Sequence, residues 1–532
     1  MPDPGDTDPP TETTDVNLDV GPIMATLAHL MATNEPPFDS ESVLLRPAVK
    51  SARARLGAVD AELSDLKRCM ERLERERGAL SRFEAGASSV LSPIRRVPRE
   101  ALVEIFGWML DSTEPSPRET CSVLSIANPP WVLAHVCSLW RAVAVATPSL
   151  WGSVTIDFDQ KKRYSEEMLR TQIARARLLN IRFFATEKGD LRHQVALFAA
   201  LTKASARWQR LTIQVSSRLA REQYELDLRS LRSVWLQWVS PNGDMQDAFT
   251  MAFLRTATGL VDIGVHCHPH ALFSLPPVHY AITRYDVDGS WTTHFDLLRL
   301  LPDLREARIA VRERWADPAE KTIVLPDLRL LYIDDPECLQ AFDVPALDAM
   351  AATVEDPSEL QALEWFLERS APRRICFHGH IETEGLDEVL ANCPSLTDIG
   401  LSFDGCGTRK KAYWKEGERA HVTAFLEIFA PAPGTPATAA LLPHVTEIRL
   451  ACELDDPTYL PLFLRTLGSR MNAEPRTIKA AELVCLQPEV NPPPHSVERL
   501  KALQEEGLQV SLSCGEVGRR MNDRWLCKAG WL

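Results

Sequence analysis

The chain has 532 residues, a formal net charge of −14, 45% apolar residues and 25% charged residues. This length is enough for two or more domains, and the composition is that of a soluble globular protein rather than a fibrous or wholly disordered one. The negative charge repels phosphate backbones and therefore disfavours generic nucleic-acid binding.

The cysteines and the N-terminal residues indicate a compartment. Twelve cysteines occur singly, with no CxxC pair, which is typical of reduced thiols rather than a disulfide framework. The first basic residue is Arg46, so there is no positively charged signal region, and the apolar run from Ile23 to Met31 is too short to span a bilayer. We expect a cytoplasmic and/or nuclear protein that has no membrane partner.

Residues 1–40 are rich in Pro, Asp and Thr, and they predict a disordered acidic tail because so few apolar residues cannot offset the entropy of ordering. One short amphipathic helix is predicted inside this tail. It is either loosely docked or a motif that binds a partner. Its apolar residues are Ile23, Met24, Leu27, Leu30 and Met31.

Residues 41–88 predict a heptad helix of the coiled-coil type, because apolar residues recur at alternating intervals of three and four. A helix over this seam is about 36 Å long at ~1.5 Å per residue. It either self-associates or folds back as a solvated spacer. The segment 86–89 predicts the break that ends it. The seam positions are Leu56, Val59, Leu63, Leu66, Met70, Leu73, Arg77 and Leu80.

Residues 89–155 predict a small helical module. Pro93 and Pro98 suit the first turns of helices, and 102–109 place apolar residues on one face. The segment 111–130 carries four prolines, so it predicts a loop. Three-four spacing then resumes and ends at Pro148. The apolar positions are Leu102, Ile105, Phe106, Met109, Leu133, Val136, Cys137, Trp140, Val143 and Ala144.

Residues 156–532 predict a repeat array, because short apolar strands recur at separations that cluster near 20 to 29 residues, the period of leucine-rich repeats. Several strands follow an apolar-Pro-x-Leu or Cys-Pro-x-Leu step, in which proline suits the turn that feeds a strand. We expect a long loop over 405–440 and irregular capping units from Ile478 to the end. The strand cores are 211–213, 234–236, 263–265, 285–287, 307–309, 330–333, 375–377, 399–401 and 448–450.

No complete catalytic motif is present: the chain has no GxSxG, HExxH, GxxxxGK[ST] or strand-linked GxGxxG pattern. Gly405-Cys406-Gly407 predicts a surface loop rather than a phosphate-binding one. Two His/Cys groups approach zinc-ligand spacing, but each lacks the second half of a site, so we interpret them as strand-edge residues. The tryptophans predict inter-repeat packing rather than a ligand pocket. We therefore expect no catalytic residue, no metal and no cofactor. The two groups are His266, Cys267, His268 and His270, and Cys376, His378 and His380.

Residues 91–151 resemble the F-box, in the form common among F-box-like proteins of mushroom-forming fungi. The resemblance rests on 93–100, Leu102, 104–106, 136–141 and 147–151, and the flanking heptad helix and repeat array complete the architecture. It implies a three-helix module that docks the Skp-type adaptor of a cullin-RING ubiquitin ligase. Matched residue by residue, the adaptor-facing or module-core positions are Pro98, Leu102, Ile105, Phe106, Val136, Cys137 and Trp140.

The fold class expected is α/β (α+β): an N-terminal helix, a small helical F-box-like module and an irregular leucine-rich-repeat-like solenoid. The function expected is that of a non-catalytic substrate receptor, in which the module docks the adaptor and the repeats bind an unknown protein substrate. An alternative stays open. In this alternative, the chain is a leucine-rich-repeat scaffold or recognition protein, and the helical bundle serves only as the end cap that a solenoid needs.

Overall fold

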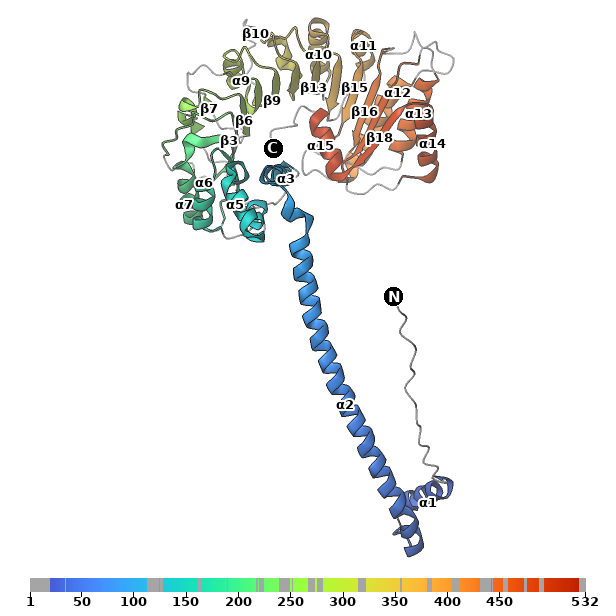
Figure 1. The fold of residues 1–532 in the computed structure, drawn as a ribbon. Coiled ribbons are helices and arrows are strands. Elements are labelled where there is room, and N and C mark those ends of the chain that lie inside the picture. The colour runs from blue at the N-terminus through green and yellow to red at the C-terminus, as the bar shows by residue number, and fades with distance from the viewer. Residues whose placement is uncertain are drawn as a thin grey trace, which may run out of the picture. The chain divides into compact units, whose positions relative to one another are not determined.

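A computed structural model gives the structure of the chain, which divides into two compact units, Met1–Pro98 and Arg99–Leu532 (Figure 1). The residues described are 20–33, 35–111, 124, 128–160, 164–188, 190–216, 219, 224–238, 249–250, 252–266, 273–274, 281–313, 322–354, 356–379, 385–403, 411–430, 442, 444–452, 458–472, 476–487 and 492–525.

The first unit consists of helices. Helix α1, Val20–Thr33, is the amphipathic helix that the sequence predicts, and it contacts the 53-residue helix α2, Asp39–Leu91. The predicted break at 86–89 is wrong, because α2 continues to Leu91 and ends where Pro93 begins the short helix η1, Pro93–Arg96. One glycine inside a helix costs only about 1 kcal/mol relative to alanine, and the alanine and serines that follow Gly86 add little to that cost. Of the predicted disordered tail, 1–40, residues 1–19 lie outside the described residues, whereas 20–33 form α1 and 39–40 belong to α2.

The second unit begins with a helical module and continues as a mixed helix-and-strand array. The module contains α3 (Arg99–Asp111), α4 (Pro129–Val136), α5 (Ser138–Ala146) and η2 (Pro148–Trp151). The predicted loop at 111–130 lies largely outside the described residues. Fourteen parallel strands then form one sheet, in which each strand pairs with the next strand of the sheet along the chain (Figure 1). They are β1 (Ser153–Asp157), β2 (Leu179–Phe184), β3 (Trp208–Val215), β4 (Ser233–Trp238), β6 (Asp262–His266), β8 (Arg284–Ser290), β9 (Glu306–Glu313), β11 (Leu330–Ile333), β13 (Ala349–Thr353), β14 (Arg374–His378), β15 (Asp398–Ser402), β16 (Glu447–Cys452), β17 (Ala480–Cys485) and β18 (Gln509–Cys514).

A tight turn precedes several of these strands. Four such turns begin at Leu301, Leu325, Val344 and Cys393, and a proline follows each of these residues. The carbonyl of the first residue accepts a hydrogen bond from the backbone N–H of the fourth residue at 3.2–3.3 Å. Proline suits this second position of a β-turn because its φ is already fixed near the required value. The leucine at the fourth position is buried in every case. The turn therefore sets the direction of the following strand and places one leucine in the core.

Helices connect most of the strands and cover one face of the sheet (Figure 1). The strand residues that face them are apolar and buried, as Ile263, Ile309 and Leu401 show, because a parallel strand under a helix must bury that face. The helices are α6 (Glu166–Arg175), α7 (Leu191–Thr202), α9 (Trp291–Leu298), α10 (Pro357–Ser370), α11 (Leu386–Ala391), α12 (Lys411–Phe429), α13 (Tyr459–Met471) and α14 (Pro494–Glu505).

Short elements complete the connections. Two small parallel sheets pair β5 (Phe249–Thr250) with β7 (Phe273–Ser274), and β10 (Ile323–Val324) with β12 (Phe342–Asp343). The single-turn helices are η3 (Phe158–Gln160), η4 (Ser205–Arg207), η5 (Ala252–Thr256) and η6 (Pro336–Ala341). None of the helices in the described ranges is long and apolar enough to cross a membrane.

Two sequence predictions for the C-terminal half are wrong. Much of the segment expected to be a loop, 405–440, is the helix α12, in which Val422, Phe425, Leu426 and Phe429 are buried on one side. The segment expected to be irregular contains two regular strands, β17 and β18, with α14 between them. The parallel array therefore continues almost to the end of the chain.

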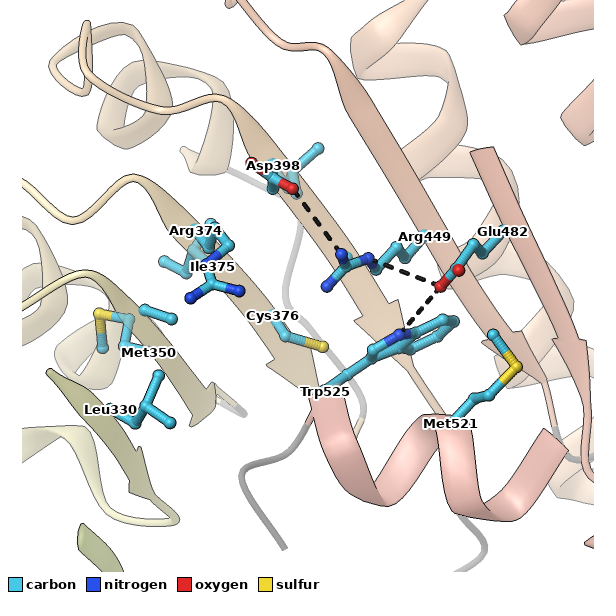
Figure 2. Close-up of a pocket in the computed structure, with 13 residues that line it drawn as sticks. Leu330, Met350, Arg374, Ile375, Cys376, Asp398, Arg449, Glu482, Met521 and Trp525 are labelled. Atoms are coloured by element: carbon cyan, nitrogen blue, oxygen red, sulfur yellow. Dashed lines mark hydrogen bonds and ion pairs between the residues drawn. The ribbon is translucent and has the colours of Figure 1, made fainter. Parts of the chain in front are cut away.

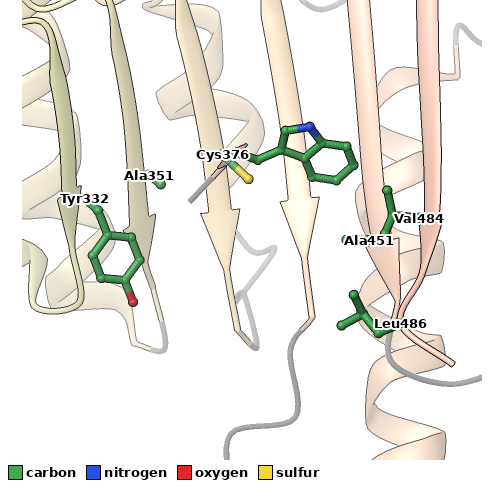
Figure 3. Close-up of a cluster of buried hydrophobic side chains, with 7 residues drawn as sticks. Tyr332, Ala351, Cys376, Ala451, Val484 and Leu486 are labelled. Atoms are coloured by element: carbon green, nitrogen blue, oxygen red, sulfur yellow. The ribbon is translucent and has the colours of Figure 1, made fainter. Parts of the chain in front are cut away.

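The last helix, α15 (Gly515–Trp525), lies on the face of the sheet opposite α10–α14 (Figure 1). It contacts β17 and β18, and Trp525 packs into a buried cluster whose strand residues include Tyr332, Ala351, Cys376 and Val484 (Figure 3). We call this the inner face of the sheet. The register places Asp286, Arg308 and Tyr332 side by side on it, because in-register residues of parallel strands point the same way.

Candidate functional site

The helical module has a compact core. Leu102 and Phe106 are fully buried, and the Phe106 ring lies 4.9 Å from the Trp140 ring, centroid to centroid. Cys137 separates α4 from α5 and caps α5, because its sulfur accepts the Trp140 backbone N–H at 3.5 Å. The Arg141 side chain donates to the Ala134 carbonyl at 2.8 Å and so holds the two helices together.

The seven predicted adaptor-binding residues divide between this core and the surface. Leu102 and Phe106 belong to the core, and Trp140 is half-buried against Phe106. Because a buried side chain has no surface to offer, we interpret Leu102 and Phe106 as module-core positions among the seven. Ile105, Val136 and Cys137 are exposed on the module, and Pro98 is exposed in the first unit.

The module leaves a set of large apolar side chains exposed. On α3 they recur at intervals of three and four, which places them along one strip of the helix. Trp108 is 67% exposed, although tryptophan is among the residues that gain most from burial. Trp108, Met109 and Val132 are additions to the seven predicted residues, and the i, i+3 spacing from Ile105 is the signal that points to Trp108. We call Ile105, Trp108, Met109, Val132 and Val136 the exposed apolar set.

The other end of the module packs on the first strand and helix of the sheet region, β1 and α6. Trp151 is fully buried, its indole N–H donates to the Ala144 carbonyl at 2.8 Å, and its ring meets Trp131 edge-on at 5.1 Å. The Arg175 guanidinium of α6 lies 4.4 Å from the centre of the Trp151 ring, close enough for a cation–π contact. The Gln172 amide donates to the Ser153 carbonyl at 2.7 Å. The module thus covers the first edge of the array.

A network of charged side chains crosses the inner face from β6 to β9. Arg308 Nη1 lies 2.7 Å from Asp286 and 3.2 Å from Asp288, and Arg312 lies 2.7 Å from Asp288. His266 is 3.1 Å from Asp286. All of these side chains except Arg312 are mostly covered, so each charge depends on its partner, since an unpaired buried charge is costly.

The surroundings shift the pKa of two carboxyl groups in opposite directions. Burial opposes ionisation of Asp286, but the hydrogen bond to His266 and the charge of Arg308 hold its pKa below the ordinary value. Burial raises the pKa of Asp334 to about 6, although the Val311 backbone N–H, 2.7 Å from Asp334 Oδ1, favours the charged form. The network is therefore able to change its charge within the weakly acidic range.

Two residues of the His/Cys groups lie on β14. His378 Nδ1 lies 3.3 Å from the Tyr332 hydroxyl and 3.2 Å from the Thr353 hydroxyl, and Cys376 is buried in the same cluster as Trp525 (Figure 2). Their interpretation as strand residues that are not ligands stands untested, and Cys267, His268, His270 and His380 lie outside the described residues. Within the described ranges, no group of three or more His, Cys, Asp or Glu side chains is arranged to hold a metal ion.

A pocket of about 240 Å³ opens on the inner face beside α15 (Figure 2). Its strand side is formed by Leu330, Ile375 and Gly400, whereas Met521 and Trp525 form the helix side. Arg374, Asp398, Arg449 and Glu482 are also part of the lining, so the pocket walls combine apolar and charged groups.

Charged side chains fix the geometry of this pocket. The Trp525 indole N–H donates to Glu482 at 3.1 Å, and the Arg449 guanidinium lies 3.7 Å from both Glu482 and Asp398 (Figure 2). Arg449 also lies 2.8 Å from Glu447, whose pKa is raised by burial and by its neighbour Asp398. Carboxylates on three strands, β15, β16 and β17, therefore balance the charge of the guanidinium. The hydrogen bond to Glu482 holds Trp525 at the pocket wall.

No known protein-family model and no curated protein sequence matches this chain.

Proposed function

We propose that this protein is a non-catalytic substrate receptor, whose F-box-like module docks a Skp-type adaptor of a cullin-RING ubiquitin ligase. The repeat region, which we interpret as an irregular leucine-rich-repeat-like solenoid, binds a target protein. Binding is the chemistry of this chain in that role, and the ligase subunits supply the transfer of ubiquitin. The protein acts in the cytoplasm, the nucleus or both.

The observation that carries the proposal is the exposed apolar set of the module. Trp108 and Val136 are both more than half exposed, and Ile105, Met109 and Val132 are each exposed by more than a third. Exposed apolar side chains gathered on one small module mark a protein-binding surface, because burying them in an interface is favourable. Two of them, Ile105 and Val136, belong to segments whose residues resemble the F-box, 104–106 and 136–141.

The inner face offers a surface for the target protein. It combines a pocket beside Trp525, which extends to Leu330 on β11, with a charged network on the adjoining strands β6, β8 and β9. A target that fits both would present one apolar side chain to the pocket and polar groups along the network. Polar complementarity of this kind confers specificity more than affinity.

The proposal is tested by mixing the purified chain with a purified Skp-type adaptor and measuring their complex. Wild type is expected to bind, and Ile105→Asp with Trp108→Ala is expected to lose binding by at least about a hundred-fold, because central apolar anchors dominate interfaces. Both positions are exposed, so the module keeps its core.

The matched control is Leu300→Asp with Trp365→Ala, an aliphatic residue and a tryptophan that are 68% and 50% exposed on the repeat region. The control is expected to bind as wild type does. Absence of binding by wild type, or equal binding by the Ile105/Trp108 variant and wild type, would contradict the proposal.

A second candidate function rests on a different observation. Trp131, Trp151 and Arg175 join the module to β1 and α6 as an end cap would. The chain would then be a leucine-rich-repeat scaffold or recognition protein whose helical module only caps the array. Under this alternative no adaptor binds wild type, while Trp151→Ala destabilises the array by about 3 to 5 kcal/mol.

A further inference from the structure

Helix α2 carries an apolar stripe that no described residue of its own unit covers. None of its residues is buried, and the contact with α1 lies at its N-terminal end (Figure 1). From residue 56 onward, apolar side chains lie on the seam of the heptad repeat with about half or more of their surface exposed: Leu56, Leu63, Leu66, Met70, Leu73 and Leu80.

The spacing assigns every residue of this stretch to a heptad position. Residues 56, 63, 70 and 77 occupy position a, and residues 59, 66, 73 and 80 occupy position d. The flanking g and e positions, which face a partner helix, carry opposite charges. At g stand Arg55 and Glu62, and five residues later at e stand Asp60 and Lys67.

These charges distinguish between the orientations of a pair. In a parallel, in-register pair, each g residue meets the e residue five positions later on the partner helix. Arg55 then meets Asp60 of the second copy, and Glu62 meets Lys67 of the second copy. The two remaining g–e combinations, Cys69 with Glu74 and Glu76 with Ser81, are free of charge repulsion.

The antiparallel pair that keeps all eight seam layers meets repulsion instead. It places Glu62 beside Glu76 and Lys67 beside Lys67 of the second copy, because g then faces g and e faces e. Asp60 also meets Glu74. Flanking residues of like charge that face each other repel and so destabilise the pair.

We propose that α2 is a dimerisation helix, which pairs in parallel and in register with α2 of a second copy of this chain. The occupant of the stripe is a second copy because the flanking charges are complementary to themselves in this arrangement. Arg77 is the one charged residue on the seam, and Glu76 of the second copy lies beside it. A single charged a position fixes the register at some cost in stability.

The first experiment measures the molar mass of the purified full chain by light scattering after gel filtration. Wild type is expected to have twice the 59.5 kDa of one chain. Leu66→Glu with Leu73→Glu places two charges in the seam, and the dissociation constant of the dimer is expected to rise by at least about a hundred-fold.

The control is Ala61→Glu with Ala79→Glu, which adds the same charges on the outer face of the helix. It is expected to remain dimeric. A monomeric wild type, or a Leu66/Leu73 variant that remains dimeric, would overturn the proposal. The result is independent of the proposed function, because no adaptor is present.

The second experiment tests the orientation. Glu62→Lys places two lysines opposite each other in the parallel pair, and it is expected to weaken the dimer roughly ten-fold. Adding Lys67→Glu restores opposite charges and is expected to restore the dimer. In the antiparallel pair Glu62→Lys would instead remove the repulsion with Glu76. Strengthening by Glu62→Lys, or no rescue by the double exchange, would therefore overturn the parallel arrangement.

Discussion

The two halves of the inner face share one strand register and differ in chemistry. On β8 and β9 the face carries Asp286 and Arg308, whereas the in-register positions of β13 and β14 carry Ala351 and Cys376. The charged half is satisfied by pairs between neighbouring strands. The apolar half is covered by α15, with Trp525 over it. Strand alternation thus decides which residues share a face, but not whether ion pairs or a covering helix stabilise their side chains.

The two halves show that one face of a sheet can be stabilised either by ion pairs between strands or by a covering helix. Side chains on the charged half must find partners within the network, because unpaired charges in a covered site are costly. On the other half, the charges around Arg449 are paired among themselves, and a single helix is enough to cover the apolar cluster beside them. We expect substitutions in the two halves to fail for different reasons, and four predictions test this.

The largest effect is expected for Arg308→Met, which leaves Asp286 and Asp288 without their shared partner. Loss of one member of a buried ion pair costs about 3 to 5 kcal/mol. Urea unfolding measures the change. Arg170→Met is the control, because its pair with Glu166 is exposed, and it should leave the unfolding midpoint nearly unchanged. Similar midpoint shifts for the two variants would show that the network contributes nothing beyond surface pairs.

The next effect is expected on the apolar half. Trp525→Ala removes the ring that covers the cluster and should cost about 3 kcal/mol, at the low end for a buried tryptophan. Hydrogen exchange should become faster in α15 and on β17, while β8 and β9 stay protected. Val517→Ala, on the exposed side of the same helix, is the control and should change neither. Uniform loss of protection over both halves would remove the distinction between them.

A smaller effect depends on pH. The pKa of Asp334 is about 6 in the folded chain and 3.8 ordinarily, so the folded state holds its proton more tightly. The stability from this group is present below pH 3.8 and is lost as the pH rises to about 6, by about 2 to 3 kcal/mol. Asp334→Asn keeps the oxygen that accepts the Val311 N–H and should not show this loss. Unfolding curves across this range that stay parallel for both proteins would refute the prediction.

The smallest effect concerns two glycines, one in each half. A Cβ at Gly264 would lie 2.4 Å from the Trp235 ring, whereas at Gly400 the nearest atom, Cys376 Sγ, would be 3.2 Å away. Gly264→Ala should therefore cost about 1 to 2 kcal/mol and Gly400→Ala less, because forced displacement of a packed ring is destabilising. Thermal unfolding compares them, and the reverse order would mean that Trp235 moves freely.

The candidate site was predictable only in part. The residues that resemble the F-box locate the module, but burial separates Leu102 and Phe106 from Ile105, although all three lie on neighbouring faces of α3. Only packing against Trp140 decides which of these faces becomes core. The pocket and the charged network were not predicted, because Arg449 and Trp525 are far apart in sequence and meet only when α15 returns to the sheet.

By itself the sequence determined many of the local elements, but not α12, β17 or β18, and it did not predict β1 or β2. All nine predicted strand cores are strands, and the heptad stretch is helical. β13 was missed because Ala349–Thr353 has few β-branched residues, although the turn at 344–347 repeats the proline step. Turns, strands and helices depend on residues a few positions apart, so their patterns are legible in the chain. The tertiary structure alone decided which polar residues meet and where α15 lies, because those contacts depend on strand register and on connections of unequal length.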